Sequence, residues 1–322
     1  MDEEIDWLSR LLEMIPVSGR VDYRCLLAAP WQLGLPELEA GQMHYHIVLN
    51  GSVIIEEPGS GPPQRLAAGQ ILLLPKGAHH LLHDESGAPP VPARNRRGLA
   101  VTFTENEGTG EHLDMLCGRF VVAPMHERLL QSYLPPRLIV STAENGTNAD
   151  QPGTKSQLSA LVSLMRMESA TDHLGGQAML AALSTAVFAL TLRLASETQE
   201  APAGLLALAG HPRLAPALSA LFNQPAHPWS LPELASLCSM SRATFVRHFQ
   251  DKMGRSASDM LTEIRMMQAA NEMRRSAAST GAIGESVGYQ SEAAFQRAFK
   301  QHMGVTPAQW RREGRQQAAA EA

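Results

Sequence analysis

The chain has 322 residues, a hydrophobic content of 44% and a formal net charge of −5 at pH 7. At roughly 100–200 residues per domain, this length predicts a globular protein of about two or three domains. Its three cysteines, Cys25, Cys117 and Cys238, are too far apart for a disulfide framework or a clustered zinc motif. The acidic start MDEEIDWLSR does not fit a secretory signal, so we expect a cytoplasmic protein.

The net charge conceals an asymmetry along the chain. Residues 212–315 hold 13 Lys and Arg against 8 Asp and Glu, whereas the rest of the chain holds 14 against 24. A basic segment joined to an acidic remainder predicts a nucleic-acid-binding module attached to a regulatory half.

Between residues 41 and 104 the pattern is typical of β-strands. The apolar or β-branched runs HYHIVLNGSVIIEE, QILLLP and GLAVTFT are separated by Gly- and Pro-rich turns. Many short strands divided by such turns predict a small barrel or sandwich.

From residue 155 to 197 the hydrophobic period becomes helical. The apolar positions expected on one face are Leu158, Leu161, Leu164 and Met165. The apolar run 178–190 is shorter than the roughly 20 residues of a membrane span, so we expect a buried helix and no membrane contact. Its apolar face predicts homodimerisation, with packing against the chain's own barrel as the alternative.

The last hundred residues contain a repeat. SRATFVRHF at 241–249 returns as SEAAFQRAF at 291–299, fifty positions later. In each copy a serine is placed to cap a helix, and two phenylalanines four residues apart form a buried face.

The sequence before each repeat predicts a first helix and a turn. Ser230 and Glu233 form a capping box that starts a helix near Leu231, and Gly288 suits the turn of the second unit. The segment SASDMLTEIRMMQAANEMRR predicts one long connecting helix. The result is two helix-turn-helix units on a rigid connector.

A helix-turn-helix places its second helix in the DNA major groove, and two units can reach successive groove faces. The outward-facing candidates for DNA contact are Arg242, Ala243, Val246, Arg247, Glu292, Ala293, Gln296, Arg297 and Lys300. We expect Arg247, Arg297 and Gln296 to read bases, and phosphate contact is the alternative role for Arg242 and Lys300. One amphipathic helix with a solvated arginine would explain a single copy, but it does not explain two.

Residues 212–312 resemble the DNA-binding domain of the AraC/XylS family, whose second half typically reads much like IGESVGYQSEAAFQRAFKQHMGVTPAQWRR. The resemblance implies promoter DNA and RNA polymerase as partners. The chain departs from the family at Ala257, where proline is usual.

The runs HYHIVLNG and GQILLLPKGAHH resemble a cupin barrel. The resemblance implies a possible metal site at His44, His46 and His80, but the glutamate that follows H-x-H in metal-binding cupins is absent. Ordinary histidines at the barrel rim are the alternative, and we expect no cofactor. A metal-dependent cupin enzyme fused to a DNA-binding domain is the alternative function.

The combination of a cupin-like barrel with an AraC-type DNA-binding domain is similar to cupin-bearing AraC regulators, and to their reactive-chlorine-sensing branch. Relatives in that branch carry one cysteine before the first cupin strands and one in a Cys-Gly near the end of the barrel, which match Cys25 and Cys117. Arg24 and Arg119 lie near them in sequence, and a cation can lower the pKa of a thiol. The signal is therefore either an oxidant sensed by these cysteines or a small molecule.

We thus expect an α+β multidomain protein that binds DNA and regulates transcription, most simply as an activator, and that is not an enzyme. The expected parts are a cupin-like sensor domain at 1–145, a helical linker and dimerisation region at 146–211, an all-α domain with two helix-turn-helix units at 212–315, and a disordered tail at 316–322.

Overall fold

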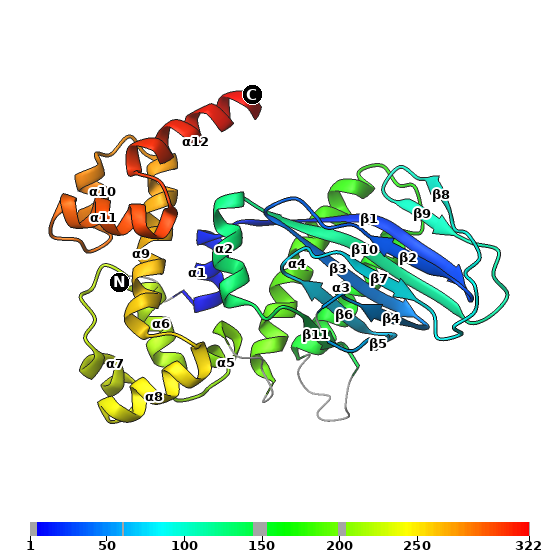
Figure 1. Cartoon of the computed structure of the whole chain (residues 1–322), viewed down its shortest axis with the longest axis horizontal. Helices are drawn as coiled ribbons and strands as arrows, with labels where there is room; N and C mark the ends of the chain where they lie inside the picture. The colour runs from blue at the N-terminus through cyan, green and yellow to red at the C-terminus, as the bar shows by residue number, and fades with distance from the viewer. Residues whose placement is uncertain (1–4, 60, 144–152, 199–203, 322) are drawn as a thin grey trace. The chain divides into compact units, whose positions relative to one another are not determined.

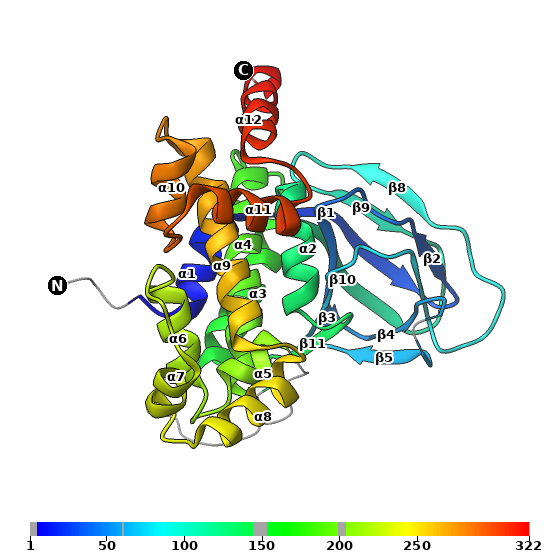
Figure 2. The same cartoon turned by 60° about the vertical axis from the view of Figure 1, so that its left-hand side comes forward.

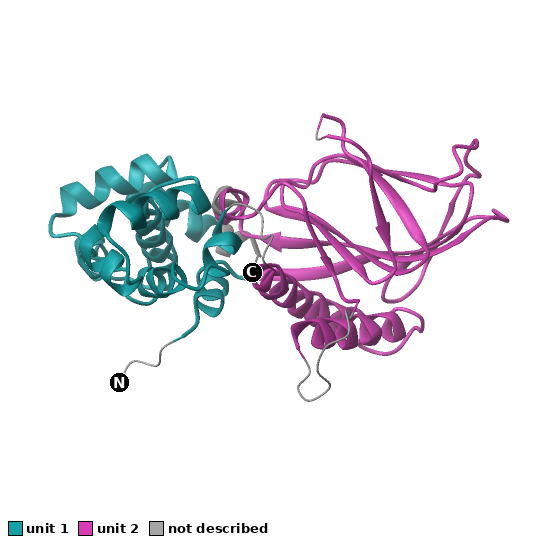
Figure 3. Cartoon of the chain, turned by 90° about the horizontal axis from the view of Figure 1, so that it is seen from below, with its two compact units in different colours: residues 1–16, 203–322 teal, residues 17–202 magenta. Residues whose placement is uncertain are grey.

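The computed structural model describes residues 5–59, 61–143, 153–198 and 204–321. Its internal contacts divide the chain into two compact units (Figure 3). We call residues 17–202 the β-unit, and residues 1–16 together with 203–322 the helical unit.

The β-unit contains two sheets, with strand orders β11-β6-β3-β10-β1-β9-β8 and β2-β7-β4-β5 (Figure 1). The larger sheet comprises β1 (Val17–Ala28), β3 (Gln42–Asn50), β6 (Gln70–Leu74), β8 (Arg94–Arg97), β9 (Thr102–Glu105), β10 (His112–Val122) and β11 (Leu138–Ser141). The smaller comprises β2 (Gln32–Leu35), β4 (Ser52–Glu56), β5 (Gln64–Ala67) and β7 (His80–His83). Apolar side chains from both sheets share one core, as expected for a cupin-like fold.

The two longest strands, β1 and β10, pair antiparallel in the middle of the larger sheet. Cys25 lies opposite Met115, and Cys117 lies two residues further along β10. Because side chains alternate between the faces of a strand, Met115 and Cys117 share a face, and both cysteines belong to the core between the sheets.

Helices α3 (Thr154–Glu168) and α4 (Gly176–Glu197) belong to the β-unit and pack against the larger sheet. The Tyr45 hydroxyl lies 2.8 Å from Ser184 Oγ of α4. A Cβ added to Gly19 of β1 would lie 2.3 Å from the Ser184 Cβ, so only glycine permits this close approach.

One expectation for α3 was wrong. The buried residues are Leu158, Val162 and Met165, at the i, i+4, i+7 spacing of a helix face. Leu164, expected on that face, is 47% exposed. The sequence did not distinguish this face from its neighbour, because Leu161 and Leu164 make the neighbouring face equally apolar.

Helix α4 is long and apolar enough, by length and composition alone, to cross a membrane. In the structure Leu180, Val187, Phe188 and Leu192 are buried, and α4 packs on α3 and β1. It is thus packed as a helix of a folded domain, in line with the expectation of a buried helix.

The helical unit contains the two predicted helix-turn-helix units. Ser230 forms the capping box with Glu233, and Ser241 and Ser291 cap the second helices of the two units. Its helices are α1 (Trp7–Met14), α5 (Leu205–Ala209), α6 (Ala215–Asn223), α7 (Leu231–Leu237), α8 (Arg242–Met253), α9 (Ala257–Arg275), α10 (Thr280–Ser286), α11 (Glu292–Met303) and α12 (Pro307–Glu321). Helix α9 is the predicted connector.

The units differ from the expected domain boundaries in the linker region, at the tail and at the N-terminus. Helices α3 and α4, assigned to a linker region at 146–211, pack within the β-unit, whereas α5 packs on α8 in the helical unit. The tail expected to be disordered from residue 316 continues α12 to Glu321, because no helix-breaking residue interrupts it. Within the expected linker region at 146–211, residues 146–152 and 199–203 lie outside the described residues. The remaining helix of the β-unit is α2 (Pro124–Tyr133).

The N-terminal helix α1 packs on α6 and α9 of the helical unit (Figure 2). Asp6 caps it, Leu8 and Leu11 are buried, and the Asn271 Nδ2 group of α9 donates a hydrogen bond to the Met14 carbonyl at 2.6 Å. Residues 1–16 therefore belong to the helical unit and not, as expected, to the sensor domain, because the apolar face of α1 is covered there.

We predict that Leu11→Ala lowers the free energy of unfolding by about 2–5 kcal/mol, because Leu11 is 1% exposed and its loss leaves a cavity. Urea denaturation measures the change. Leu237→Ala is the control, since Leu237 of the same unit is 45% exposed. Equal losses in the two variants would contradict the packing of α1.

Candidate functional site

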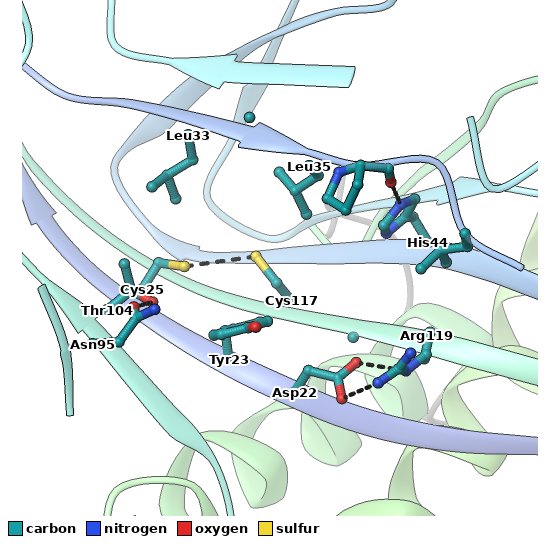
Figure 4. A pocket seen from close by; sticks show the side chains of 14 residues that line it. Asp22, Tyr23, Cys25, Leu33, Leu35, His44, Asn95, Thr104, Cys117 and Arg119 are labelled. Carbon is teal, nitrogen blue, oxygen red and sulfur yellow. Dashed lines mark hydrogen bonds and ion pairs between the residues drawn. The ribbon is translucent and has the colours of Figure 1, made fainter. Parts of the chain in front are cut away.

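A cavity of about 320 Å³ lies between the two sheets of the β-unit (Figure 4). Its wall combines the Cys25 and Cys117 thiols with Leu33 and Leu35 of the smaller sheet, and with His44. A space of this size admits a small molecule, and it brings apolar, sulfur-bearing and ionisable groups together.

Cys25 and Cys117 form the closest pair of thiols in the described structure, with their Sγ atoms 3.7 Å apart. Both side chains are buried. A disulfide requires a sulfur–sulfur distance of about 2.05 Å, so a modest side-chain movement would bring the two sulfurs to bonding distance. The structure thus places the two residues predicted for redox sensing side by side.

A glycine shapes this wall. Gly118 follows Cys117, and a Cβ added there would lie 2.6 Å from the Tyr45 ring and 2.2 Å from the Arg20 carbonyl. The Cys-Gly pair noted in the sequence is therefore explained by backbone packing: only glycine lets Tyr45 pass beneath β10.

The imidazoles of His46 and His80 form a hydrogen-bonded chain that begins at the Cys117 thiol. Cys117 Sγ lies 3.2 Å from His46 Nδ1, and His46 Nε2 lies 2.8 Å from His80 Nε2 of the opposite sheet. The second nitrogen of His80, Nδ1, lies 2.9 Å from the carbonyl of Ala78.

The order of donors follows from the last carbonyl, which can only accept. In neutral rings, His80 Nδ1 donates to Ala78, so His80 Nε2 accepts from His46 Nε2, and His46 Nδ1 accepts from the Cys117 thiol. Burial lowers the pKa of His80 to about 4 and holds the pKa of His46 well below its usual range, which keeps both rings neutral at pH 7.

The three histidines expected at a metal site are all buried, and one nitrogen of each lies within 4.8 Å of the others. His44 Nε2 faces the Pro36 carbonyl at 3.0 Å, so each ring has an outer partner and one inward nitrogen, as metal-binding histidines do. Two nitrogens on one tetrahedral zinc lie about 3.3 Å apart, whereas those of His46 and His80 lie at the 2.8 Å of a hydrogen bond. The donor chemistry suits a metal and the spacing suits a hydrogen-bonded pair, so metal binding stays a prediction.

The two arginines beside the cysteines are engaged by carboxylates. Arg24 forms a buried, bidentate ion pair with Asp114, and Arg119 forms a bidentate but partly exposed ion pair with Asp22. The hydrogen bond with Cys25, together with burial, raises the pKa of the Cys117 thiol well above its usual range. Cys117 is therefore held as a thiol rather than a thiolate.

Sequence reasoning missed the ion pair of Asp22 and Arg119 in the cavity wall. The pairing of β1 with β10 shifts by one residue between Val21 and Tyr23, which is a β-bulge at Asp22. The bulge breaks the two-residue alternation, so Asp22 and Cys25, of opposite parity, both line the cavity. In the sequence, the charged residues of RVDYR were the only sign of this ion pair.

The second candidate site is the exposed face of α8 and α11 in the helical unit. The nine residues predicted to contact DNA are all exposed on these two helices. Phe245 and Phe249 in α8, and Phe295 and Phe299 in α11, are buried as expected. The two helices thus present the same positions to solvent, fifty residues apart.

The departure at Ala257 leaves the local turn intact. Ala257 begins α9 after the cap Ser256, as Pro307 begins α12. Gly254 and Gly304 both end their helices in the left-handed conformation, with φ of 76° and 77°.

Comparison with known proteins accounts for both units. A cupin model matches residues 6–197, and a helix-turn-helix domain model matches residues 234–313. An HTH-type transcriptional regulator of Haemophilus influenzae is 30% identical over 96% of this chain and 99% of its own length. This chain belongs to the AraC/XylS family of transcriptional regulators. It is accordingly a DNA-binding transcriptional regulator with a cupin domain, and not an enzyme.

Two other relatives span nearly the whole chain. The RCS-specific HTH-type transcriptional activator RclR of Escherichia coli is 29% identical over 97% of this chain and 99% of its own. The regulator MtrA of Neisseria gonorrhoeae is 27% identical over 97% and 100%. Among solved structures, an AraC-type regulator from Chromobacterium violaceum aligns with 33% of this chain and 94% of its own, at 25% identity and a TM-score of 0.31.

Proposed function

We propose that this regulator activates transcription in the cytoplasm when an oxidant joins Cys25 to Cys117 in the cupin cavity. The observation that carries the proposal is the 3.7 Å contact between the two sulfurs at the wall of a cavity. The name of the relative RclR, an RCS-specific activator, points to the same class of signal.

The reaction that suits this site uses a neutral hypohalous acid, which can enter without a charge penalty. The Cys25 sulfur attacks the chlorine of hypochlorous acid, which forms an S–Cl bond and releases water with the thiol proton. The Cys117 sulfur then displaces chloride to form the disulfide, and its proton passes to His46 Nδ1, 3.2 Å away. Two thiols lose two electrons in total, and hypochlorous acid is reduced to chloride and water.

The role of His46 follows from the raised pKa of Cys117. Because that thiol does not ionise readily, a proton acceptor in contact with it is needed as the new bond forms. His46 offers an unprotonated nitrogen, and the bond from its other nitrogen to His80 holds the ring in that orientation.

We predict that Cys25→Ser and Cys117→Ser each abolish promoter activation by hypochlorite in cells, because a disulfide needs both sulfurs. Cys238→Ser is the matched control: this third buried cysteine lies in the helical unit and should leave the response intact. Reporter transcription before and after hypochlorite measures the effect.

Undiminished responses in both cavity variants would contradict oxidant sensing by these thiols. They would favour the second candidate, binding of a small molecule in the same cavity. The observation for that candidate is the mixed wall of leucines, His44 and the Asp22–Arg119 ion pair.

For the DNA-binding function we propose that α8 and α11 enter successive major grooves of the promoter, where the regulator meets RNA polymerase. Arg247 and Arg297 stand at equivalent exposed positions, and a guanidinium pairs bidentately with guanine O6 and N7. The bound promoter is thus read by two arginines from two helices.

We predict that Arg247→Ala and Arg297→Ala each weaken binding to the cognate promoter by about 1–3 kcal/mol, with smaller effects on random duplex. Arg193→Ala, an exposed arginine of α4 in the β-unit, is the control. Titrations at one fixed salt concentration measure both affinities. Equal losses on cognate and random DNA would show a phosphate contact instead of base reading.

We further propose that the regulator is a homodimer that buries an apolar surface of the α3–α4 hairpin. The exposed apolar residues there are Leu164, Met167, Leu174 and Met179. Large apolar side chains left exposed on neighbouring segments are the material of an interaction surface.

We predict a dimer in sedimentation at micromolar concentration, and a monomer for the double variant Met167→Glu, Met179→Glu, because two charges then face the apolar surface of the partner. A monomer for the unmodified chain, with and without promoter DNA, would contradict the proposal.

A further inference from the structure

The two recognition helices share a framework but differ in the chemistry of their first turns. At equivalent positions, α8 carries Arg242 and Val246 where α11 carries Glu292 and Gln296. All four side chains are exposed. The second unit thus has an acid where the first has a base, on the face proposed to meet DNA.

Glu292 and Gln296 are joined one helical turn apart. Gln296 Nε2 donates a hydrogen bond to Glu292 Oε1 at 2.9 Å. The other carboxylate oxygen, Oε2, lies over Gly281 of α10, where an added Cβ would come within 2.9 Å of it. The absent side chain at Gly281 therefore leaves room for the carboxylate, which is placed between α10 and Gln296.

This arrangement changes what Gln296 offers to a base. A glutamine amide has two N–H donors and one carbonyl acceptor, and one of the donors is already used by Glu292. The carboxylate contributes acceptors only. The pair therefore presents mostly acceptors, whereas Arg242 presents donors and Val246 an apolar surface.

We propose that Glu292 determines the specificity of the second unit by selecting, at one position of the strand that it faces in the major groove, a base with an exocyclic amino group, cytosine (N4) or adenine (N6). Carboxylates accept from cytosine N4, whereas guanine O6 and N7 and thymine O4 are themselves acceptors and leave the carboxylate without a donor. The inference rests on the proposed placement of α11 in the groove.

The first unit selects differently at the equivalent positions. A guanidinium at Arg242 favours guanine or a phosphate, and Val246 favours the thymine methyl group. The two half-sites of the promoter are therefore not repeats of one sequence, although the two protein units are repeats of one fold. An acid close to the DNA also weakens binding to duplexes that lack the selected base, because it repels phosphates.

The test is selection of bound sequences from a randomised duplex library by the full-length regulator and its variants. We expect the unmodified protein to prefer cytosine or adenine at one position of the second half-site by about 5- to 150-fold. Glu292→Ala should reduce this preference to near unity at that position alone, and Glu292→Gln should shift it toward adenine. Ser291, the helix cap, is unchanged in both variants, so α11 is retained.

Glu313→Ala is the control, because it removes the same charge from α12 outside both helix-turn-helix units. A uniform rise in affinity for all duplexes with Glu292→Ala, with every base preference unchanged, would overturn the inference. Failure of the proposed groove placement is a separate result: Arg297→Ala would then also leave every base preference unchanged.

Discussion

The antiparallel pairing of β1 with β10 is the constraint on which the rest of the β-unit depends. It brings Cys25 and Cys117, far apart in sequence, to the same inner face, and it joins Arg24 to Asp114 in a buried ion pair. Arg24 also donates to the Arg166 carbonyl at the end of α3, so the same pairing anchors the helices that cover the outer face. Buried ion pairs of this kind tolerate the loss of one partner poorly, because the other charge is left without compensation.

Burying the chain of thiols and imidazoles costs desolvation free energy, which the hydrogen bonds between these groups offset. Each polar atom from Cys117 through His80 has a partner, and the chain ends on the backbone carbonyl of Ala78. Neutral rings avoid the desolvation penalty of a buried charge. Under the proposed function, the hydrogen bond with Cys25 and burial keep the Cys117 thiol protonated until an oxidant enters, so that this sulfur is unreactive without the signal.

The parts of the fold that could be predicted were those with local signals. The helical unit is specified by signals that lie only a few residues apart in sequence, namely the caps at Ser230, Ser241 and Ser291 and the paired phenylalanines. The structure has these caps and buried phenylalanines as expected. The H-x-H motif placed His44 and His46 on one face in the same way, because strand alternation is also local.

What the sequence could not show depended on contacts between distant segments. The bulge at Asp22 exists only in the register of β1 against β10. The raised pKa of Cys117 comes from Cys25 and from burial, so the position of Arg119, two residues away in sequence, did not indicate the reactivity of this thiol. The hydrogen bond from Gln296 to Glu292 was within reach of sequence reasoning at its i, i+4 spacing.

The packing of α1 has a consequence for how the DNA-binding part of this regulator can be isolated. The helix-turn-helix model covers residues 234–313, yet the helical unit also takes residues 5–16 from the other end of the chain, and Leu11 and Ile15 are buried there. A fragment that starts at residue 203 would expose to water the apolar surface of α6 and α9 that α1 covers. The helical unit is therefore discontinuous in sequence, and a circularly permuted chain that fuses residues 5–16 to residues 204–321 is the form in which that unit would be complete.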